Sequence, residues 1–95
     1  MAAVQFFAYE DLTVAATAVG GTAATYSNGD YATVLVEVAP VRFRLDGGTP
    51  TATVGDLLNV GDRLTLEGKE ELTRVRFIRK DGTSATLRMQ YGVQK

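Results

Sequence analysis

Cysteine and histidine are the side chains most often used as nucleophiles, general bases and transition-metal ligands, and this chain has neither. Pairs of carboxylates are the remaining candidates for acid–base chemistry. One such pair is Asp62 with Glu67, but Asp62 lies in a Gly-Asp turn sequence where aspartate commonly bonds the backbone. Adjacent Glu70 and Glu71 point in different directions in any regular structure. We therefore expect turn and cap roles for these acids, no catalytic residue and no enzymatic activity.

Five aspartates lie in or beside expected loops, where they could in principle bind calcium: Asp30, Asp46, Asp56, Asp62 and Asp81. The chain lacks the spacing of alternating oxygen ligands closed by a glutamate that defines an EF-hand loop, and nothing in the sequence supports a site assembled from separate loops. The glycine pairs at 20–21 and 47–48 do not match a phosphate-binding loop, which requires a following lysine and a helix start. The sequence thus predicts no metal ion and no cofactor.

The arginines form the most prominent group with binding chemistry. Five of them are expected on outward faces of strands: Arg42, Arg44, Arg74, Arg76 and Arg88. If those strands are neighbours, the guanidinium groups form one basic patch suited to pairing with carboxylates of another subunit. The alternative is that they are solvated and pair within the chain, with four candidate acids: Glu37, Asp46, Glu70 or Glu71. The five arginines are therefore a candidate interface.

Charge and length limit the other partners. Ten basic and eleven acidic residues give a formal net charge of -1, which argues against nucleic-acid binding. No apolar run approaches the ~20 residues that span a membrane. Tyrosine rings could instead stack on sugars, with Tyr26 and Tyr31 as the candidate stacking residues, although such tyrosines more often close the ends of a small core.

Strands are predicted for most of the first half of the chain. Residues 2–9 and 11–19 are expected to form two strands, the second with Leu12, Val14 and Ala16 on one face. Residues 20–30 read as a turn or exposed loop. Strict alternation then predicts strands at 31–39 and, after Pro40, at 41–46. The expected inward residues of these two strands are Ala32, Val34, Val36, Val38, Val41, Phe43 and Leu45.

The second half continues this pattern. Residues 47–50 are expected to form a tight turn, 51–54 a short extended piece and 56–60 one helical turn. Residues 62–67 alternate as a strand, and 67–72 favour another helical turn. An Asp-Gly turn at 81–82 predicts a hairpin between 74–79 and 84–91. The expected inward residues of this hairpin are Val75, Phe77, Ala85, Leu87, Met89 and Tyr91.

These elements predict an all-β fold, a small antiparallel β-sandwich or barrel of about seven strands with at most short helical turns. The 95 residues read as one domain. Residues 1–10 are expected to form an edge strand or an arm, because residues 2–8 carry no charge that would prevent edge pairing. A core this thin gains stability by packing against further copies, so we expect a homo-oligomer.

Several short motifs in residues 36–92 carry a family resemblance: Arg42-Phe43-Arg44 running into Asp46-Gly47, Thr49-Pro50-Thr51, Gly61-Asp62 before Leu64, Glu70-Glu71-Leu72, and Ala85-Thr86-Leu87. With these motifs the segment resembles small proteins of tailed bacteriophages and prophages that are encoded among the virion structural genes. The N-terminal third is similar to the family in having Thr-rich and Ala-rich strands before a Tyr-containing loop.

The resemblance implies a non-enzymatic structural protein of the virion, such as a capsid decoration or cement protein that assembles through β-sheet surfaces. A head-tail or tail component is an open alternative. Capsid or other virion proteins would then be the partners, and the chain would be made in the host cytoplasm and reside in the virion. From the residues alone, the competing hypothesis is a β-sandwich module that binds a carbohydrate or a cell-surface ligand.

Overall fold

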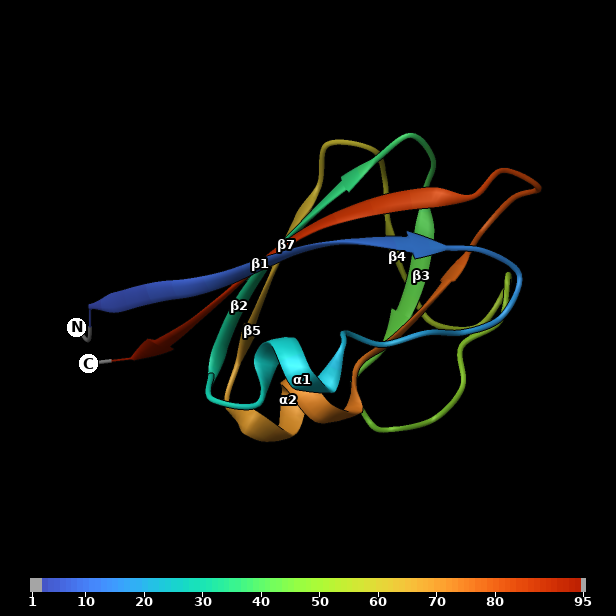
Figure 1. Cartoon of the computed structure of the whole chain (residues 1–95). Coiled ribbons are helices and arrows are strands. Elements are labelled where there is room, and N and C mark those ends of the chain that lie inside the picture. The colour runs from blue at the N-terminus through green and yellow to red at the C-terminus, as the bar shows by residue number, and fades with distance from the viewer. Residues whose placement is uncertain (1–2, 95) are drawn as a thin grey trace.

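A computed structural model describes residues 3–94, and the side chains of all of these except residues 23 and 24. Seven strands form two antiparallel sheets that pack against each other (Figure 1). In chain order the elements are β1 (Val4–Val14), α1 (Ala23–Tyr26), β2 (Tyr31–Glu37), β3 (Val41–Arg44), β4 (Asp56–Leu58), β5 (Arg63–Glu67), α2 (Lys69–Arg74), β6 (Arg76–Arg79) and β7 (Ala85–Gln94). The predicted all-β class is confirmed, and the architecture is a sandwich.

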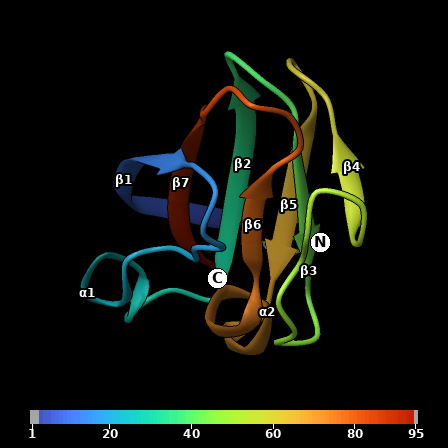
Figure 2. The ribbon, with the colours of Figure 1, turned by 90° about the vertical axis from the view of Figure 1, so that its right-hand side faces the viewer.

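The larger sheet has the strand order β1-β7-β2-β5, and the smaller sheet has the order β4-β3-β6. Both short helices lie at one end of the sandwich, while the turns from β2 to β3 and from β4 to β5 lie at the other end (Figure 2). The N-terminal end of β1 and the C-terminal end of β7 project together beyond the body (Figure 1). This projection makes the molecule elongated, with extents of 39 × 25 × 24 Å.

The core lies between the sheets and is built from the inward positions of alternating strands. On β7 the four predicted inward residues, Ala85, Leu87, Met89 and Tyr91, are all buried. From the smaller sheet, Val41 and Phe77 are fully enclosed and Phe43 is buried. Because successive side chains of a strand point to opposite faces, a period of two in the sequence is enough to place these residues. Full burial of a valine, leucine, methionine or phenylalanine side chain among them contributes roughly 1.5 to 3 kcal/mol.

The prediction that Val38 and Leu45 face the core is wrong, because they are 67% and 37% exposed. β2 ends at Glu37, where the chain leaves one sheet for the other, and the Ala39 N–H donates to the Glu37 carbonyl at 3.0 Å. This three-residue turn holds Val38 at a φ of 78°, a strained conformation for a β-branched residue. The alternation could not continue through Val38 because β2 and β3 belong to different sheets.

The helical turn predicted for 56–60 is also wrong. Asp56–Leu58 is the strand β4, which pairs with β3 through Leu58 opposite Val41 and Asp56 opposite Phe43. Gly55 permits the close approach, because its φ is 127° and a Cβ atom there would lie 2.9 Å from the Phe43 carbonyl oxygen. Residues 51–54 form a closed turn between the Thr51 and Val54 backbones instead of an extended piece. Tertiary pairing here overrides a weak local preference.

The predicted hairpin of 74–79 with 84–91 does not form. Both strands exist, but β6 pairs with β3 in the smaller sheet and β7 lies between β1 and β2 in the larger one. The turn at 81–82 therefore joins the two sheets. A turn sequence fixes local backbone direction, whereas the choice of neighbour depends on which edge is free to pair.

The N-terminal prediction needs a further correction. Where the sequence suggested strands at 2–9 and 11–19, the structure has a single strand, Val4–Val14, and Ala16 is exposed; residue 2 lies outside the described residues. The segment 20–30 contains the short helix α1. Elsewhere the agreement is closer, since β5 matches the strand predicted at 62–67 and α2 begins two residues after the start of the helical turn predicted at 67–72.

Candidate functional site

Each sheet has two edge strands, and these differ in how far their outer backbone groups are covered. In the smaller sheet, the edge of β6 is covered by the segment that follows β1. The Val19 N–H donates to the Phe77 carbonyl at 2.9 Å, and the Phe77 N–H donates back to the Val19 carbonyl at 2.7 Å. The Arg79 N–H also reaches the Ala15 carbonyl at 3.2 Å. The backbone groups at this edge are therefore already in use.

The edges of β4 and β5 are short or partly occupied. β4 has three residues. β5 has five, and the Glu67 N–H donates to the Glu71 carboxylate at 2.8 Å instead of remaining free. The exposed side chains of Arg63 and Glu67 add charge along this edge. Short length, capping groups and charge are all features that discourage pairing with another chain.

The edge of β1 is less protected. Its protecting features are two acidic residues and a bulge. The strand is 11 residues long, contains no proline, lysine or arginine, and among the described residues pairs only with β7. Three aromatic side chains on it remain exposed, with Phe6 and Phe7 at 45% and Tyr9 at 53%. We call this feature, β1 with its exposed aromatic residues Phe6, Phe7 and Tyr9, the β1 edge. It is the candidate functional site.

The two phenylalanines of the β1 edge pack beside glycines. Phe6 and Tyr31 both lie opposite Gly92 in their respective strand pairs, and their rings meet edge to face with centroids 6.0 Å apart. A Cβ atom at Gly92 would lie 2.8 Å from the Gln5 carbonyl oxygen. Phe7 packs on Gly29, where a Cβ atom would lie 3.2 Å from its ring. The rings are therefore positioned by close backbone packing while about half of each stays open.

A β-bulge separates the two phenylalanines. The register against β7 runs from Phe6 opposite Gly92 directly to Ala8 opposite Tyr91, so Phe7 is an extra residue. Ala8 packs on the core, whereas Phe6 and Tyr9 lie on the outer face of the sheet. The bulge thus reverses the alternation along β1. Two adjacent phenylalanines in an expected half-buried strand were a signal that the sequence reasoning missed, because both cannot face the core.

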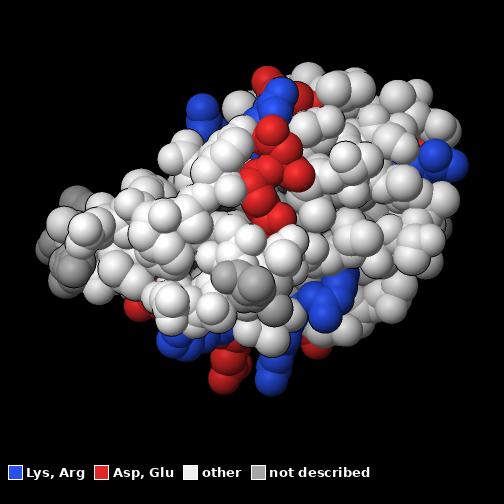
Figure 3. Space-filling model, in the orientation of Figure 1, with Lys and Arg blue, Asp and Glu red and all other residues white. Residues whose placement is uncertain are grey.

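Two acidic residues, Glu10 and Asp11, lie in the middle of the β1 edge. Asp11, on the outer face, forms an ion pair with Arg88 of the neighbouring strand β7. Arg88 Nη1 lies 2.7 Å from Asp11 Oδ2, and Arg88 Nε lies 2.5 Å from Glu37 Oε1. The Tyr9 hydroxyl also donates to Asp11. The hydrogen bond from Tyr9 and the pairing with Arg88 lower the pKa of Asp11. Figure 3 shows acidic atoms gathered near the middle of the face in view, while the projecting end is largely uncharged.

Glu10 faces inward and fastens β1 to the body. Its carboxylate accepts hydrogen bonds from the Tyr91 hydroxyl at 2.5 Å, the Thr22 hydroxyl at 2.8 Å and the Thr22 N–H at 2.9 Å. Burial alone would raise the pKa of Glu10, but these donors outweigh it and the pKa is lowered. Burial and the neighbouring Glu10 raise the pKa of Tyr91. Both groups are satisfied by each other, so this cluster is a structural joint.

The five predicted arginines do not form one patch. Arg44 lies directly opposite Arg76 on the paired strands β3 and β6, and Arg42 is two residues from Arg44 on the same face. Arg74 lies on α2. Arg88 is in the other sheet, beside Asp11 and Glu37. The condition for a common patch therefore holds for β3 and β6 and fails for β7.

All five guanidinium groups have acceptors or ion-pair partners within the chain. Arg42 donates to the carbonyls of Ala52 at 2.8 Å and Gly55 at 3.0 Å, which ties the loop before β4 to the sheet. Arg76 donates to the carbonyls of Thr73 and Val75 at 2.9 and 2.7 Å. Three arginines pair with acids that the sequence had suggested as alternatives: Arg44 with Asp46, Arg74 with Glu70 and Arg88 with Glu37. Their main visible role is intramolecular.

The two candidate stacking tyrosines lie on different faces. The Tyr26 ring packs on buried Tyr91, with centroids 5.9 Å apart, and contributes to the rim of the core. Tyr31 lies on the outer face of β2 against Phe6. They therefore do not form a common platform for a sugar ring.

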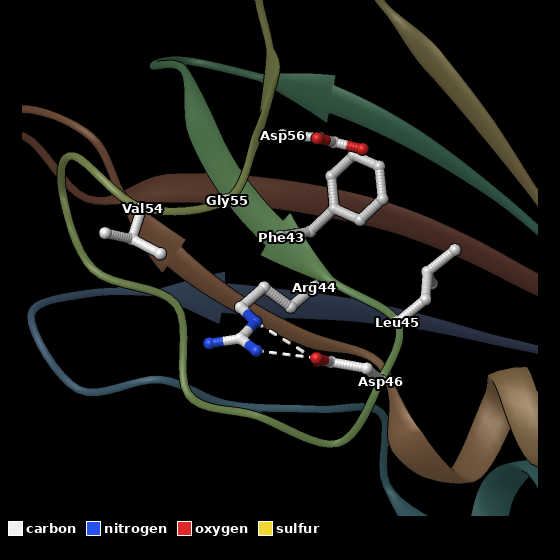
Figure 4. Close-up of a pocket in the computed structure, with 7 residues that line it drawn as sticks. All are labelled: Phe43, Arg44, Leu45, Asp46, Val54, Gly55 and Asp56. Carbon is white, nitrogen blue, oxygen red and sulfur yellow. Dashed lines mark hydrogen bonds and ion pairs between the residues drawn. The ribbon is translucent and has the colours of Figure 1, made fainter.

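A shallow hollow of about 340 Å³ lies between the end of β3 and the start of β4 (Figure 4). Phe43, Leu45 and Val54 line it, and Figure 4 shows Arg44 turned toward Asp46 beside it. The Arg44–Asp46 pair is bidentate, at 2.6 and 3.1 Å, and Asp46 also accepts from the Gly48 N–H. Arg44 and Asp46, two of the three charged residues that line the hollow, therefore hold the turn at 46–48; the third is Asp56.

The remaining acids have the turn roles expected from the sequence where the structure shows a partner. Asp62 accepts from the Asn59 N–H at 2.8 Å, and Glu71 accepts from the Glu67 N–H. Within residues 3–94 no three acidic side chains come together as a metal site would require. No helix in that part of the chain is long and apolar enough to cross a membrane.

Comparisons with protein-family models, with curated proteins and with solved structures found no match to this chain.

Proposed function

We propose that this chain is a non-enzymatic structural protein of a phage virion, specifically a capsid decoration or cement protein, and that it assembles through its β-sheet surfaces. The observation that carries the proposal is the β1 edge. It is a long strand edge with free backbone groups and three half-exposed aromatic rings, in a protein whose other edges are covered, short or charged. Edges of this kind bind other strands.

The location in a virion rests on the resemblance of residues 36–92 to small structural proteins of tailed phages. The small core supports an assembly role independently, because a 95-residue domain buries only about 60 to 65% of its unfolded surface and gains stability from contacts with neighbours. The partners would be capsid proteins or copies of the chain itself. A head-tail or tail component uses the same surfaces and differs in copy number.

Carbohydrate binding is the competing function, and the geometry favours it less. A sugar-binding platform needs exposed rings on one face, whereas Tyr26 packs on Tyr91 and Tyr31 packs on Phe6. A glycan array probed with the purified protein addresses this alternative directly. Binding that is lost in Tyr31→Ala and retained in Tyr26→Ala would favour a ligand-binding module.

The deciding experiment is analysis of gradient-purified particles of the parent phage by quantitative mass spectrometry and cryo-electron microscopy. We expect the chain on the capsid in a number of copies proportional to the major capsid protein. A few copies at one vertex would instead identify a head-tail or tail component. Absence of the chain from purified particles would overturn the proposal.

A further inference from the structure

We propose that β1 pairs with β1 of a second copy, antiparallel and about a two-fold axis, so that the larger sheets of two copies become one continuous sheet. This inference rests on the proposed assembly function and identifies the partner at the β1 edge. The occupant is a second copy because one register of β1 on β1 places outer residues opposite outer residues, pairs aromatic side chains across the strands and keeps the acidic residues of the two copies far apart.

The bulge restricts the possible registers. Before it, Val4 and Phe6 lie on the outer face; after it, the outer residues are Tyr9, Asp11 and Thr13. In a continuous sheet, residues opposite each other must lie on the same face. Because the bulge reverses the alternation, segment 4–6 of one copy matches the faces of segment 9–11 of the other when the paired residue numbers add up to an odd number.

Among the odd sums, 15 gives the longest match. An even sum matches the faces only on one side of the bulge, and the longest such match, a sum of 22, places Asp11 opposite Asp11 of the second copy, where like charges destabilise the pairing. Phe6 then lies opposite Tyr9 of the second copy, Gln5 opposite Glu10 and Val4 opposite Asp11, and the two-fold axis repeats each pair. Cross-strand aromatic pairs stabilise antiparallel strands. A sum of 17 places Phe6 opposite Asp11 and brings the inward Ala8 opposite the outward Tyr9. The aromatic residues therefore favour the register of 15.

Charge points the same way. Residues 3–9 are uncharged, so the central part of this pairing contains no ion. The two Glu10 residues would be five positions apart along the strands, about 17 Å, which is beyond the Debye length of about 8 Å at physiological salt. A pairing centred on Tyr9 would instead leave each Glu10 two positions from the Glu10 of the other copy. Asp11 keeps Arg88 as its partner in either case.

The size of the contact sets its strength. Each aromatic residue of the β1 edge exposes roughly 100 Å², about half of its full area. An eight-residue overlap is about 27 Å long. Together these supply less than the about 800 Å² per partner of a standard stable interface. We therefore expect a weak dimer, which becomes populated where copies are concentrated on an assembly.

Cysteine cross-linking tests the register, because the natural chain contains no cysteine. Phe6→Cys and Tyr9→Cys are made as separate variants, oxidised alone and as an equimolar mixture, and analysed on a non-reducing gel. In the mixed dimer one Phe6–Tyr9 pair becomes the disulfide and the other pair stays intact. Expected is a disulfide-linked dimer at least tenfold more abundant in the mixture than in either variant alone.

Controls separate this pairing from random collision and from other registers. Thr65→Cys, an exposed position on the outer face of β5, mixed with Phe6→Cys should give only background linking. Equal linking in that mixture would overturn the proposal, as would a dominant dimer of Tyr9→Cys alone, which indicates a register centred on Tyr9. Absence of linking in every mixture would mean that the bulge protects the edge. If no mixture links but the chain is found on purified particles, the proposed dimer is wrong and the proposed function is retained.

Discussion

The edge strands β6 and β1 differ in whether another segment of the chain covers them. At β6, the segment after β1 returns and occupies the backbone groups, and Phe77 beneath it is fully buried. At β1, nothing among the described residues pairs with the outer side, and Phe6, Phe7 and Tyr9 stay about half exposed. The same residue type thus contributes to the core at one edge and is available to a partner at the other.

The largest expected effect contrasts the two phenylalanines. Phe77→Ala should reduce the free energy of unfolding by about 3 to 5 kcal/mol, because it leaves a cavity between the sheets. Phe6→Ala should cost less than about 1 kcal/mol, since half of its ring is already in water. Chemical denaturation of both variants at low protein concentration measures this difference. Equal losses would mean that Phe6 is a core residue and that the β1 edge is closed.

The next effect concerns the cover over β6. Val19→Pro removes the N–H that donates to the Phe77 carbonyl, and we expect a loss of about 1 to 3 kcal/mol relative to Val19→Ala, which keeps that donor. The uncovered edge should also increase aggregation, measured by light scattering during refolding. If Val19→Pro and Val19→Ala unfold at the same denaturant concentration, the segment does not protect β6.

How far the sequence anticipates this contrast depends on which interactions are local. The alternation of β2 and β7 predicted their inward residues because each side chain's face follows from its neighbours alone. Pairing partners were not predictable in this way. The Asp81-Gly82 turn suggested a hairpin, yet β6 and β7 joined different sheets, and Asp56–Leu58 became a strand only because β3 was beside it.

The candidate site was partly visible in the sequence. The lack of charge in residues 2–8 suggested an edge strand or arm, but the exposure of Phe6 and Tyr9 depends on a bulge and on Gly92, which come together only in the folded chain. The arginine patch required β7 to lie beside β3 or β6, which alternation cannot establish. A role of individual arginines at an interface remains a prediction.

A smaller effect is expected at the joint, where Glu10 binds Tyr91 and Thr22 and fastens β1 to the body. The pKa of Glu10 is lowered in the folded state, so its contribution to stability is present above its ordinary pKa of 4.5 and is lost as the pH falls through the folded value. The free energy of unfolding should therefore fall more steeply below pH 4.5 in the natural protein than in Glu10→Gln. Urea titrations between pH 6 and 3 measure this, with Glu70→Gln as the matched surface control. Parallel curves for the natural protein and Glu10→Gln would show that the joint does not fasten β1.

The smallest effect is expected at the arginines, and it decides between the two candidate surfaces. Arg74 and Glu70 are exposed and 3.9 Å apart, so Arg74→Ser should change the free energy of unfolding by less than about 0.5 kcal/mol. Sedimentation at increasing concentration should likewise show the same weak self-association as the natural chain, whereas Tyr9→Lys, which places a charge on the β1 edge, should abolish it. The opposite result, in which Arg74→Ser no longer self-associates and Tyr9→Lys still does, would contradict a role of the β1 edge. Copies would then meet through guanidinium groups near α2, and the β1 edge would remain exposed to solvent.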